Sequence, residues 1–471
     1  MRALIIISFL TCSCILRGQV WTNLIDSIPN QGWAHFVTAT VDSTSNTLYL
    51  GGQFWRFNQF NTNSIIRYNG SSFDTLQSGL NDFDYALPQV ATMIMFQNKL
   101  YVGGNFQKTG KYWCKNLGRW NGTSWDTTNF NPNGTILSLE KYNNELYVSG
   151  NFTSIGGISA NGIAKFDGVN WYSLNHPAGL DIIDFKFFNG KLYKVGMVTP
   201  ASSSANLSYF DGTNWIPWVG VDGDNNKGVE GITVIDTMMY VYGRFNSIAG
   251  TNCKGLVAFN GKKWFGLGSG LSNSQWETIY KIEKINGVMY IYGHYNTIEG
   301  ISTGTVNGQV QMYTNIVKFD GVKFCTFSPP FGYDIHDIVG FNNNIFALGS
   351  FRKIGNDSVW GFVRWDGGNT IVACTPAIAI TPSAIGIQEY FNFSNLKIYP
   401  NPFTEKLFIE ILDFDAQKYS FTIYNQLGEI VRMQNNFCQN AEIDLSSVSS
   451  GMYFVKIQIG GNQKTFKVTK Q

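Results

Sequence analysis

The stretch LYVGGNF at Leu100–Phe106, followed by LGRWNGTSW at Leu117–Trp125, recurs along most of this chain. The next copy reads LYVSGNF at Leu146–Phe152 and IAKFDGVNW at Ile163–Trp171. The aromatic residue of the first motif marks seven units, at Tyr49, Tyr101, Tyr147, Tyr193, Tyr240, Tyr290 and Phe346. The glycine of the second motif marks the same seven, at Gly70, Gly122, Gly168, Gly212, Gly261, Gly321 and Gly367. The aromatic marker therefore defines a repeat of 46 to 56 residues.

Each unit contains four short β-rich runs and no helical periodicity. In the third unit these runs are Ile136–Tyr142, Leu146–Phe152, Ile163–Phe166 and Trp171–Leu174. Asn-Gly or Asp-Gly separates the last two runs, and such pairs favour hairpin turns because both residues tolerate positive φ. A four-stranded sheet cannot bury both faces alone, whereas sheets arranged radially cover one another. The sequence therefore predicts a seven-bladed β-propeller over residues 20–374, the larger part of an all-β protein.

The paired glycines Gly51-Gly52 and Gly103-Gly104, with the aromatic residues around them, resemble kelch-type propellers. The chain departs from that family in its tight DGxxW spacing. It departs again in the fourth unit, where Val195-Gly196-Met197 replaces the glycine pair. The resemblance implies the fold only, because propellers carry unrelated functions.

The two ends of the repeat allow two ways of closing the ring. The run Trp21–Leu24 has the character of a fourth strand that precedes the first complete unit, and it could pair into the last blade. In the alternative it is a lead-in strand, and Thr370–Cys374 closes the seventh blade. The sequence does not choose between them.

The charge balance argues against a nucleic-acid interface, and the first residues predict export. Only 14% of the 471 residues are charged and the net charge is +2, with no run of Lys or Arg. Residues 1–18 are typical of a signal peptide, with Arg2, an apolar Ala3–Leu10 and cleavage between Gly18 and Gln19. No later segment reaches the ~18 apolar residues that cross a bilayer, so we expect no transmembrane segment in the mature chain.

The cysteines allow more than one arrangement. A lipid anchor at Cys12 or Cys14 is the weaker alternative to cleavage, because neither follows a Leu-small-small run. Cleavage leaves five cysteines, an odd number, at Cys114, Cys253, Cys325, Cys374 and Cys438. Cys325 and Cys374 occupy similar places in successive units and could form a disulfide. Five buried, unreactive thiols are the favoured expectation.

The sequence changes character after the repeats. Residues 375–394 carry prolines and small residues without a blade marker, which indicates a linker. Alternating apolar runs then follow at Leu396–Ile411, Tyr419–Val431 and Ile443–Lys470. They predict a small antiparallel, Ig-like β-sandwich of about seven strands over residues 395–471.

This tail closely resembles the type A C-terminal sorting domain of the type IX secretion system. The resemblance rests on YPNPF at Tyr399–Phe403, YNQLGEIV at Tyr424–Val431, DLSSVSSGMYFVKI at Asp444–Ile457 and the lysines at the end of the chain. The residues that carry the motif are Pro400, Asn401, Pro402, Gly428, Gly451 and Tyr453. The family implies the type IX secretion machinery as a partner. It also implies passage through the periplasm, and secretion or anchoring at the outer surface of a Gram-negative bacterium. A carbohydrate-binding or adhesive sandwich is the alternative.

Catalytic and metal-binding signatures are sparse. The four histidines, His35, His176, His294 and His336, fall at unrelated places without a metal-ligand spacing, and we expect them to be isolated surface residues. There is no GxSxG and no phosphate-binding loop. The stretch Asp222–Gly228 spaces oxygen side chains as a calcium loop does, but it lacks the required glycine and glutamate. We therefore predict no catalytic residue, cofactor or metal.

Two sets of positions are candidates for ligand contact. The first lies on the innermost strand of each unit, which lines the channel of a propeller, and its carboxylates are Glu140, Asp184, Glu283 and Asp337. Polar lining of a wet channel explains them best, ahead of a ligand ring or catalysis. The second set follows the glycine pair, at Gln53, Asn105, Asn151, Met197, Arg244, His294 and Ser350. Its variation suits recognition, but a freely varying solvent-facing site is the simpler explanation.

The sequence thus supports an exported cell-surface or secreted propeller that binds a glycan or a protein without catalysis. The alternative is a secreted hydrolase or lyase that acts on polysaccharide through two of the four carboxylates, which would then have to lie within ~5–10 Å of each other. A purely structural surface component is the third possibility.

Overall fold

The computed structural model divides the chain into two compact units, Met1–Ile380 and Thr381–Gln471. It describes residues 21–25, 35–58, 60, 62–81, 88–126, 130–177, 182–196, 207–218, 221–222, 228–267, 271, 278–295, 297–298, 301–302, 313–319, 323–327, 329, 331–367, 374–376, 396–411, 419–437, 441–459 and 462–471. The predicted signal segment 1–18, with its cleavage site at Gly18 and Gln19, lies outside these ranges, as do residues 377–394 of the predicted linker. Every element in the described ranges is a β-strand, and none is a helix that could cross a membrane.

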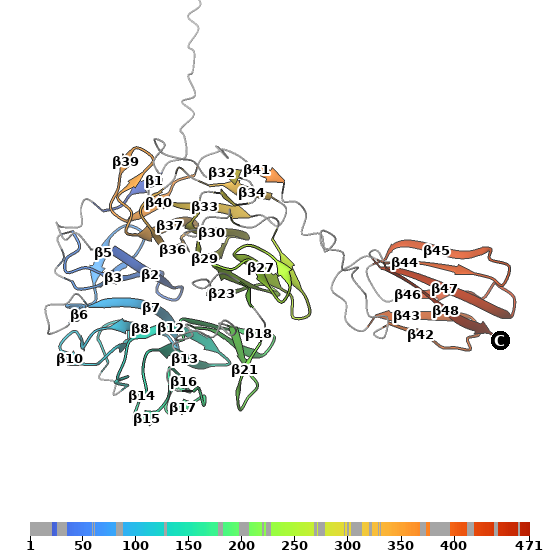
Figure 1. Cartoon of the computed structure of the whole chain (residues 1–471), viewed down its shortest axis with the longest axis horizontal. Coiled ribbons are helices and arrows are strands. Elements are labelled where there is room, and N and C mark those ends of the chain that lie inside the picture. The colour runs from blue at the N-terminus through green and yellow to red at the C-terminus, as the bar shows by residue number, and fades with distance from the viewer. Residues whose placement is uncertain are drawn as a thin grey trace, which may run out of the picture. The chain divides into compact units, whose positions relative to one another are not determined.

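The described residues of the first unit form seven radial sheets, which we call blades 1 to 7 (Figure 1). Blade 1 is β2 (His35–Asp42), β3 (Thr47–Gln53), β4 (Ile65–Tyr68) and β5 (Phe73–Thr75). Blade 2 is β7 (Gln89–Phe96), β8 (Lys99–Asn105) and β11 (Leu117–Trp120). Blade 3 is β12 (Ile136–Tyr142), β13 (Glu145–Gly150), β16 (Ile163–Phe166) and β17 (Trp171–Ser173). Blade 4 is β18 (Asp184–Phe188), β19 (Lys191–Val195), β20 (Leu207–Phe210) and β21 (Trp215–Pro217). Blade 5 is β23 (Val229–Ile235), β24 (Met238–Gly243), β27 (Leu256–Phe259) and β28 (Trp264–Gly266). Blade 6 is β29 (Thr278–Ile285), β30 (Val288–His294), β33 (Tyr313–Phe319), β34 (Lys323–Thr326) and β41 (Cys374–Pro376). Blade 7 is β36 (Ile335–Phe341), β37 (Asn344–Gly349), β40 (Phe362–Trp365) and β1 (Trp21–Asn23).

A short hairpin follows the second strand of several blades. These hairpins are β9 (Lys108–Thr109) with β10 (Tyr112–Trp113), β14 (Ser154–Ile155) with β15 (Ile158–Ser159), β25 (Ser247–Ile248) with β26 (Thr251–Asn252), β31 (Thr297–Ile298) with β32 (Ile301–Ser302), and β38 (Lys353–Ile354) with β39 (Asp357–Ser358). Three of them also pair with a strand that precedes their blade, namely β6 (Leu80–Asn81), β22 (Val221–Asp222) and β35 (Phe331–Gly332).

The innermost strands form a closed ring. They contact one another in the order β2, β7, β12, β18, β23, β29 and β36, and β36 returns to β2. All pairings within the blades are antiparallel, as the turn signals predict. The predicted all-β propeller class is confirmed.

The ring closes by sharing a blade between the two ends of the repeat. β1 pairs with β40, with Trp21 opposite Trp365, so the strand nearest the N-terminus completes blade 7. Of the two closures left open by the sequence, the first is found. The alternative in which Thr370–Cys374 closes blade 7 is wrong, because β41 pairs with β34 at the outer edge of blade 6. β41 also includes residues 375 and 376, so the predicted linker begins too early.

The cysteines only partly follow the favoured expectation. Cys114 and Cys253 are buried thiols that form no disulfide, as expected. Cys325, however, is disulfide-bonded, and the residue opposite it across the β34–β41 pair is Cys374. The expectation of five free thiols is therefore wrong. The backbone register explains the difference, because directly opposite residues of an antiparallel pair come close enough for a disulfide.

The aromatic marker of each unit packs against the following blade. Tyr49 of blade 1 belongs to a buried cluster with Val90 of blade 2, and Phe346 of blade 7 clusters with Phe36 of blade 1. Because side chains alternate along a strand, the residue after the marker faces the preceding blade instead. Val102 follows this rule, since it lies in the cluster between blades 1 and 2. The hydrophobic core is thus distributed between blades, so each blade depends on its neighbours to bury its apolar side chains.

Lys194 breaks this pattern. It follows the marker in blade 4, where the other units have Leu50, Val102, Val148, Val241, Ile291 and Ala347. Its side chain is only 6% exposed, and its Nζ lies 5.5 Å from the centre of the Trp215 ring. Within the described part of the chain no carboxylate pairs with it. Burial lowers the pKa of Lys194 to about 8.

The recurrent glycines have two separate physical causes. A Cβ on Gly104, the second glycine of its pair, would lie 2.0 Å from the carbonyl oxygen of Gln89 in the adjacent strand, so no side chain fits. Gly168 has a φ of 106°, which disfavours any other residue. The side chain of Asp167 accepts hydrogen bonds of 2.7 Å from the N–H groups of Val169 and Asn170 and completes this turn.

The second unit is a sandwich of two antiparallel sheets. One sheet has β42 (Leu396–Tyr399), β43 (Lys406–Ile411) and β46 (Ala441–Asp444). The other has β45 (Ile430–Phe437), β44 (Tyr419–Tyr424), β47 (Gly451–Ile459) and β48 (Asn462–Lys470), in that order. Residues from both sheets, among them Leu407, Ile423 and Val455, form one buried cluster. The predicted small Ig-like sandwich is therefore present, with its own core.

The separate motifs of the tail converge at the last strand. Between Pro400 and Pro402, which have no N–H, the amide of Asn401 replaces backbone pairing: it donates to Lys467 O at 3.1 Å and accepts from Thr469 N at 3.0 Å. The ammonium of Lys470 donates to three carbonyls of the loop before β47, those of residues 445, 446 and 448, at 2.6–3.0 Å.

The start of β47 is held in a similar way. Tyr453 OH donates to Ser449 O at 2.6 Å, and Gly451 stands at the turn into the strand with a φ of 152°. The end of the chain therefore holds together three motifs that are far apart in sequence.

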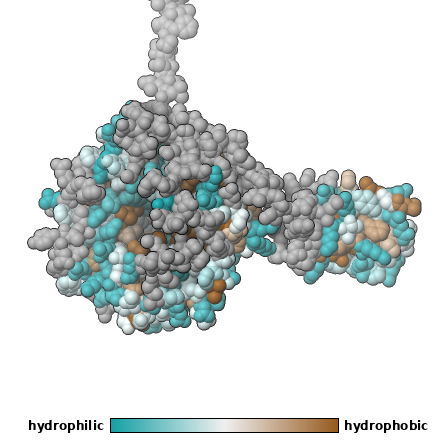
Figure 2. All heavy atoms as spheres, viewed as in Figure 1, coloured by the Kyte–Doolittle hydropathy of each residue, from teal (hydrophilic) through white to brown (hydrophobic). Residues whose placement is uncertain are grey.

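The remaining motif forms an exposed hairpin between β44 and β45. Gly428 has a φ of 82°, and Asn425 Oδ1 accepts hydrogen bonds from Leu427 N and Glu429 N. Leu427 at the tip is 84% exposed, and Ile430 is exposed beside it. Hydrophobic atoms are visible on the β45 side of this unit (Figure 2). A rigid hairpin thus presents apolar side chains to the solvent.

Candidate functional site

The four carboxylates proposed from the sequence lie on innermost strands and form two pairs. Glu140 of β12 and Asp184 of β18 both approach Lys186. Its Nζ lies 2.7 Å from Glu140 Oε2 and 3.7 Å from Asp184 Oδ1. Because Lys186 belongs to β18, its ion pair with Glu140 links blade 4 to blade 3.

The second pair repeats this arrangement between blades 6 and 7. Lys281 Nζ lies 2.8 Å from both Glu283 Oε1 and Asp337 Oδ1. Lys281 and Glu283 belong to β29, whereas Asp337 belongs to β36. The structure therefore brings the four predicted residues together as two carboxylate–lysine–carboxylate groups, each of which crosses a blade boundary.

Asp184 and Asp337 also bind the backbone of the following blade. Asp337 Oδ2 accepts a hydrogen bond of 2.9 Å from Ala39 N in blade 1, and Asp184 Oδ2 accepts one of 3.4 Å from Ile232 N in blade 5. In both cases the donating N–H lies just after a β-bulge of its strand, where the hydrogen-bond ladder between strands is interrupted. These two aspartates thus connect neighbouring blades.

The lysines remain charged in this environment. Burial by itself would lower the pKa of Lys186, but Asp184 and Glu140 outweigh it and the pKa rises. Asp337 and Glu283 overcome burial in the same way and raise the pKa of Lys281 well above its usual value. An adjacent ammonium favours the ionised form of a carboxylate, whereas a general acid must keep its proton near neutral pH.

We expect Asp337→Asn to destabilise the propeller by about 2 kcal/mol, because it removes a buried charge that Lys281, Ala39 and Tyr292 all contact. Glu283→Gln is the matched control. It loses an ion pair with the same lysine, but Glu283 is more exposed, so we expect less than about 1 kcal/mol. Denaturant unfolding followed by tryptophan fluorescence measures both. Equal effects would show that Asp337 does not connect the blades.

A second polar cluster lies where the first strands of blades 5, 6 and 7 begin. Arg244 Nε donates a hydrogen bond of 2.6 Å to Glu230 Oε1, and Thr278 Oγ1 donates to the other oxygen of Glu230. Tyr280 OH donates to Asp334 Oδ1 at 3.1 Å. Burial and the charge of Asp334 raise the pKa of Tyr280, so this phenol stays neutral.

Tyr333 adds an exposed aromatic ring beside Asp334. It is 62% exposed and has a φ of 85°, a conformation that is uncommon for any residue with a side chain. Backbone strain of this kind concentrates at functional positions, because the surrounding structure must maintain it. We call the group Glu230, Arg244, Thr278, Tyr280, Tyr333 and Asp334 the blade 5–7 site.

The histidines do not follow the expectation of isolated surface residues. His35 and His336, which are far apart in sequence, have ring centres 5.1 Å apart in an edge-to-face arrangement. Burial and the neighbouring His35 charge contribute to a lowered pKa of His336, although its Nδ1 lies 2.6 Å from Phe36 O. His176 is buried at the boundary of blades 3 and 4. The meeting of first strands in the ring explains the His35–His336 contact, which no sequence spacing indicates.

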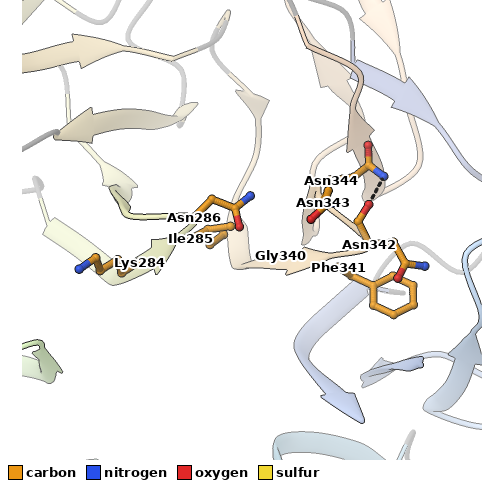
Figure 3. Close-up of a pocket in the computed structure, with 8 residues that line it drawn as sticks. All are labelled: Lys284, Ile285, Asn286, Gly340, Phe341, Asn342, Asn343 and Asn344. Carbon is orange, nitrogen blue, oxygen red and sulfur yellow. Dashed lines mark hydrogen bonds between the residues drawn. The ribbon is translucent and has the colours of Figure 1, made fainter. Parts of the chain in front are cut away.

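A cavity of about 370 Å³ opens between blades 6 and 7 (Figure 3). It is lined by Lys284, Ile285, Asn286, Gly340, Phe341, Asn342, Asn343 and Asn344. Several of its asparagines have a structural explanation. Asn286, Asn342 and Asn343 have φ values of 51°, 49° and 61°, which hairpin turns of this type require. Asn344 Nδ2 donates to Asn342 O at 2.9 Å. The four carboxylates do not line this cavity.

The other sequence candidates have mixed outcomes. Of the positions after the glycine pair, Arg244 takes part in the blade 5–7 site, Asn105 and Asn151 are exposed, and Met197 lies outside the described residues. Most of the calcium-like stretch, residues 223–227, lies outside them as well. Within the described ranges, no three His, Cys, Asp or Glu side chains group so as to hold a metal ion.

Sequence reasoning missed most of the blade 5–7 site. Glu230, Tyr280 and Tyr333 follow no motif, and each comes from a different blade. The one available signal was position, because all three lie within three residues of the start of a first strand. Glu230 and Tyr280 each precede the aromatic marker by ten residues, whereas Tyr333 precedes Phe346 by thirteen, so counting along the units aligns only the first two.

The comparisons with known proteins identify the tail. Residues 397–471 match the secretion system C-terminal sorting domain. The tail is therefore a type IX sorting domain, which implies interaction with the type IX secretion machinery. It directs the chain across the outer membrane of a Gram-negative bacterium, to the cell surface or into the medium. A search of curated proteins finds no match.

Solved structures show distant likenesses. The PorZ surface component of the type-IX secretion system of Porphyromonas gingivalis matches at 14% identity and a TM-score of 0.33, over 93% of this chain and 66% of PorZ. The extracellular domain of the hybrid two component system BT4673 from B. thetaiotaomicron matches at 11% identity and a TM-score of 0.44, over 97% of this chain and 59% of that one. Trypanosoma rangeli sialidase matches at 14% identity and a TM-score of 0.34, over 96% of this chain and 89% of the enzyme. This chain spans less than two thirds of the first two, and likenesses this distant carry no inference about activity.

Proposed function

We propose that this protein is an exported, non-catalytic β-propeller that binds a glycan through the blade 5–7 site. The observation that carries the proposal is Tyr333, a largely exposed tyrosine with a φ of 85°, next to the Asp334–Tyr280 hydrogen bond. A second partner, the type IX secretion machinery, follows from the sorting domain.

The chemistry of the blade 5–7 site suits a sugar. Tyr333 is 62% exposed and Tyr280 is 38% exposed, and the flat face of a tyrosine ring can cover the C–H face of a pyranose while its hydroxyl stays hydrated. Asp334 and Glu230 can accept hydrogen bonds from sugar hydroxyls, and Arg244 can donate them. Burial of an aromatic face with a few oriented polar groups is the general form of small-ligand recognition.

The absence of catalysis is part of the proposal. What supports it is the ammonium between each pair of carboxylates, since Lys186 and Lys281 are held charged and bind the groups that a hydrolase would need free. The alternative, a hydrolase or lyase acting on polysaccharide, is supported by the closeness of the carboxylates within each pair. Glu140 and Asp184 both approach Lys186 Nζ. Glu283 and Asp337 both approach Lys281 Nζ.

The test is binding of the full chain to a glycan array, with Tyr333→Gly as the informative variant. Glycine accepts a φ of 85° without strain, so we expect the variant to keep its stability and to lose affinity for its glycan at least about tenfold. Tyr172→Ala, which removes an exposed tyrosine from blade 3, should bind as the parent does.

Three outcomes would contradict the proposal. The array could show no saturable binding, as a structural component or a receptor for a protein would. The Tyr333→Gly variant could bind as tightly as the parent, which would place the glycan elsewhere. Release of reducing ends from a bound polysaccharide, lost in Glu140→Gln, would favour the hydrolase.

A further inference from the structure

The hairpin β9–β10 of blade 2 differs from its counterparts in the other blades. Trp113 lies opposite Lys108 across this hairpin. The residues at the register of Trp113 in blades 3, 5, 6 and 7 are Ser159, Asn252, Ser302 and Ser358. The fold therefore accepts a small polar residue at this place, and only blade 2 of these five has a tryptophan there.

Trp113 is more exposed than buried. It is 59% exposed, although the burial of a tryptophan stabilises a protein more than that of almost any other side chain. Lys108 Nζ lies 4.6 Å from the centre of its ring, and Lys111 Nζ lies 5.3 Å from the centre of the Tyr112 ring. Each of these two ammonium groups thus lies near an aromatic ring, of which Trp113 is exposed and Tyr112 also packs against the buried cluster between blades 1 and 2.

The charge of this region is concentrated. Between residues 85 and 125 there is no Asp or Glu, and the basic residues are Lys99, Lys108, Lys111, Lys115 and Arg119. Five positive charges in this segment exceed the net charge of +2 of the whole chain. Lys99 and Arg119 both bind Asp126, at 3.2 Å and 2.7 Å. Lys111 and Lys115 are exposed and, within the described ranges, have no ion pair.

The base of the hairpin is firmly anchored. Cys114 is buried, its N–H donates to Gln107 O at 3.0 Å, and Gly110 N donates to Gly79 O at 2.8 Å. A Cβ on Gly110 would lie 3.1 Å from the buried ring of Trp125. The tip therefore presents its aromatic and basic side chains from a rigid support, which lowers the entropy lost on binding.

We propose that the β9–β10 hairpin of blade 2 binds an acidic polysaccharide, with Trp113 against a sugar ring and the ammonium groups of Lys111 and Lys115 toward its carboxylate or sulfate groups. A polymer with regularly spaced charges matches ammonium groups spread along one hairpin, and it is accessible to a protein delivered outside the cell. This surface belongs to blade 2, so it stands whether or not the blade 5–7 site binds a glycan.

The experiment measures binding of the full chain to polygalacturonate and to dextran sulfate, with neutral dextran as the comparison. The informative variant is Lys111→Gly with Trp113→Ser, which installs the residues of blade 3, Gly157 and Ser159, and should therefore fold. The matched control is Lys353→Ser, because Lys353 occupies the register of Lys108 in blade 7.

We expect the parent and the Lys353→Ser control to bind at least one acidic polymer and to ignore dextran. The double variant should bind at least about tenfold more weakly. Raising the salt from about 50 mM to about 500 mM should weaken binding by the parent, because salt screens exposed charges.

Four results with these polymers, variants and vesicles would overturn the proposal, and a fifth concerns Tyr333→Gly. They are failure of the parent to bind either acidic polymer, equal binding of dextran, full binding by the double variant, and binding only to vesicles that contain anionic lipid. Tyr333→Gly separates this surface from the blade 5–7 site. If that variant loses an array glycan but retains the acidic polymer, the two surfaces are distinct, whereas loss of the acidic polymer would place it at blades 5–7 and overturn the hairpin assignment.

Discussion

Deletion of Leu396–Gln471 is expected to abolish delivery to the cell surface and the medium and to leave the propeller in the periplasm. The deleted residues contain the whole sorting domain, which has its own buried cluster, so the cores between the blades remain complete without it. Cell fractionation and protease protection of intact cells measure the effect. Surface exposure of the shortened chain at the level of the parent would mean that export does not depend on this domain.

A point variant makes the same test sharper. Lys470→Met removes a buried ammonium that donates to three loop carbonyls, of which Leu445 O keeps the hydrogen bond from Val448 N. We expect it to unfold part of the sorting domain and to reduce export severalfold. Lys464→Met is the control, because Lys464 lies on the same strand and its side chain is exposed. Equal export of the two variants would show that the contacts of Lys470 do not support the sorting domain.

Replacement of Lys194 by methionine is expected to stabilise the propeller by about 3 kcal/mol at neutral pH. The buried ammonium has a pKa of about 8 instead of 10.5, and a tenfold loss of proton affinity corresponds to about 1.4 kcal/mol. Methionine has a similar shape and no charge, and the other units hold apolar residues at this register. All 13 tryptophans of the chain precede residue 381, so their fluorescence during urea unfolding reports on the propeller alone.

The gain should depend on pH in a defined direction. The folded state binds the proton of Lys194 less readily than the unfolded state, so the cost of this lysine is present in full below pH 8. Above about pH 8 the folded lysine is neutral, so folding releases the proton that the unfolded chain still holds. This release becomes less costly as the pH rises, and the cost disappears near pH 10.5, where the unfolded lysine also loses its proton. The advantage of Lys194→Met should therefore shrink over that window.

Lys191→Met is the control for Lys194→Met, because Lys191 lies in the same strand and is exposed. We expect it to change the free energy of unfolding by less than about 0.5 kcal/mol. If Lys194→Met is destabilised, or if its gain stays constant up to pH 10.5, burial of the Lys194 ammonium does not lower the free energy of unfolding of the propeller. Partial exposure of Nζ to solvent in the native state would be the physical reason.

The repeat, its turns and the sorting motif could be read from the sequence because each depends on residues close together in the chain. Gly104 is required by one adjacent strand, and Gly168 by the φ of a single turn. Asn401 stands between two prolines whose missing N–H groups are evident without a structure. The positions of Glu140, Asp184, Glu283 and Asp337 on innermost strands followed from the same counting.

Only the tertiary structure decided which of these residues meet. Asp337 binds Ala39 across the closure of the ring, and Tyr280 binds Asp334 from the neighbouring blade. The pairing of β1 with β40 was one of two closures that the sequence allowed equally. The physical reason is that neighbouring blades touch through side chains about one repeat or nearly the whole ring apart in sequence. Local patterns determine what each blade is, whereas the closed ring determines which side chain of one blade faces which side chain of the next.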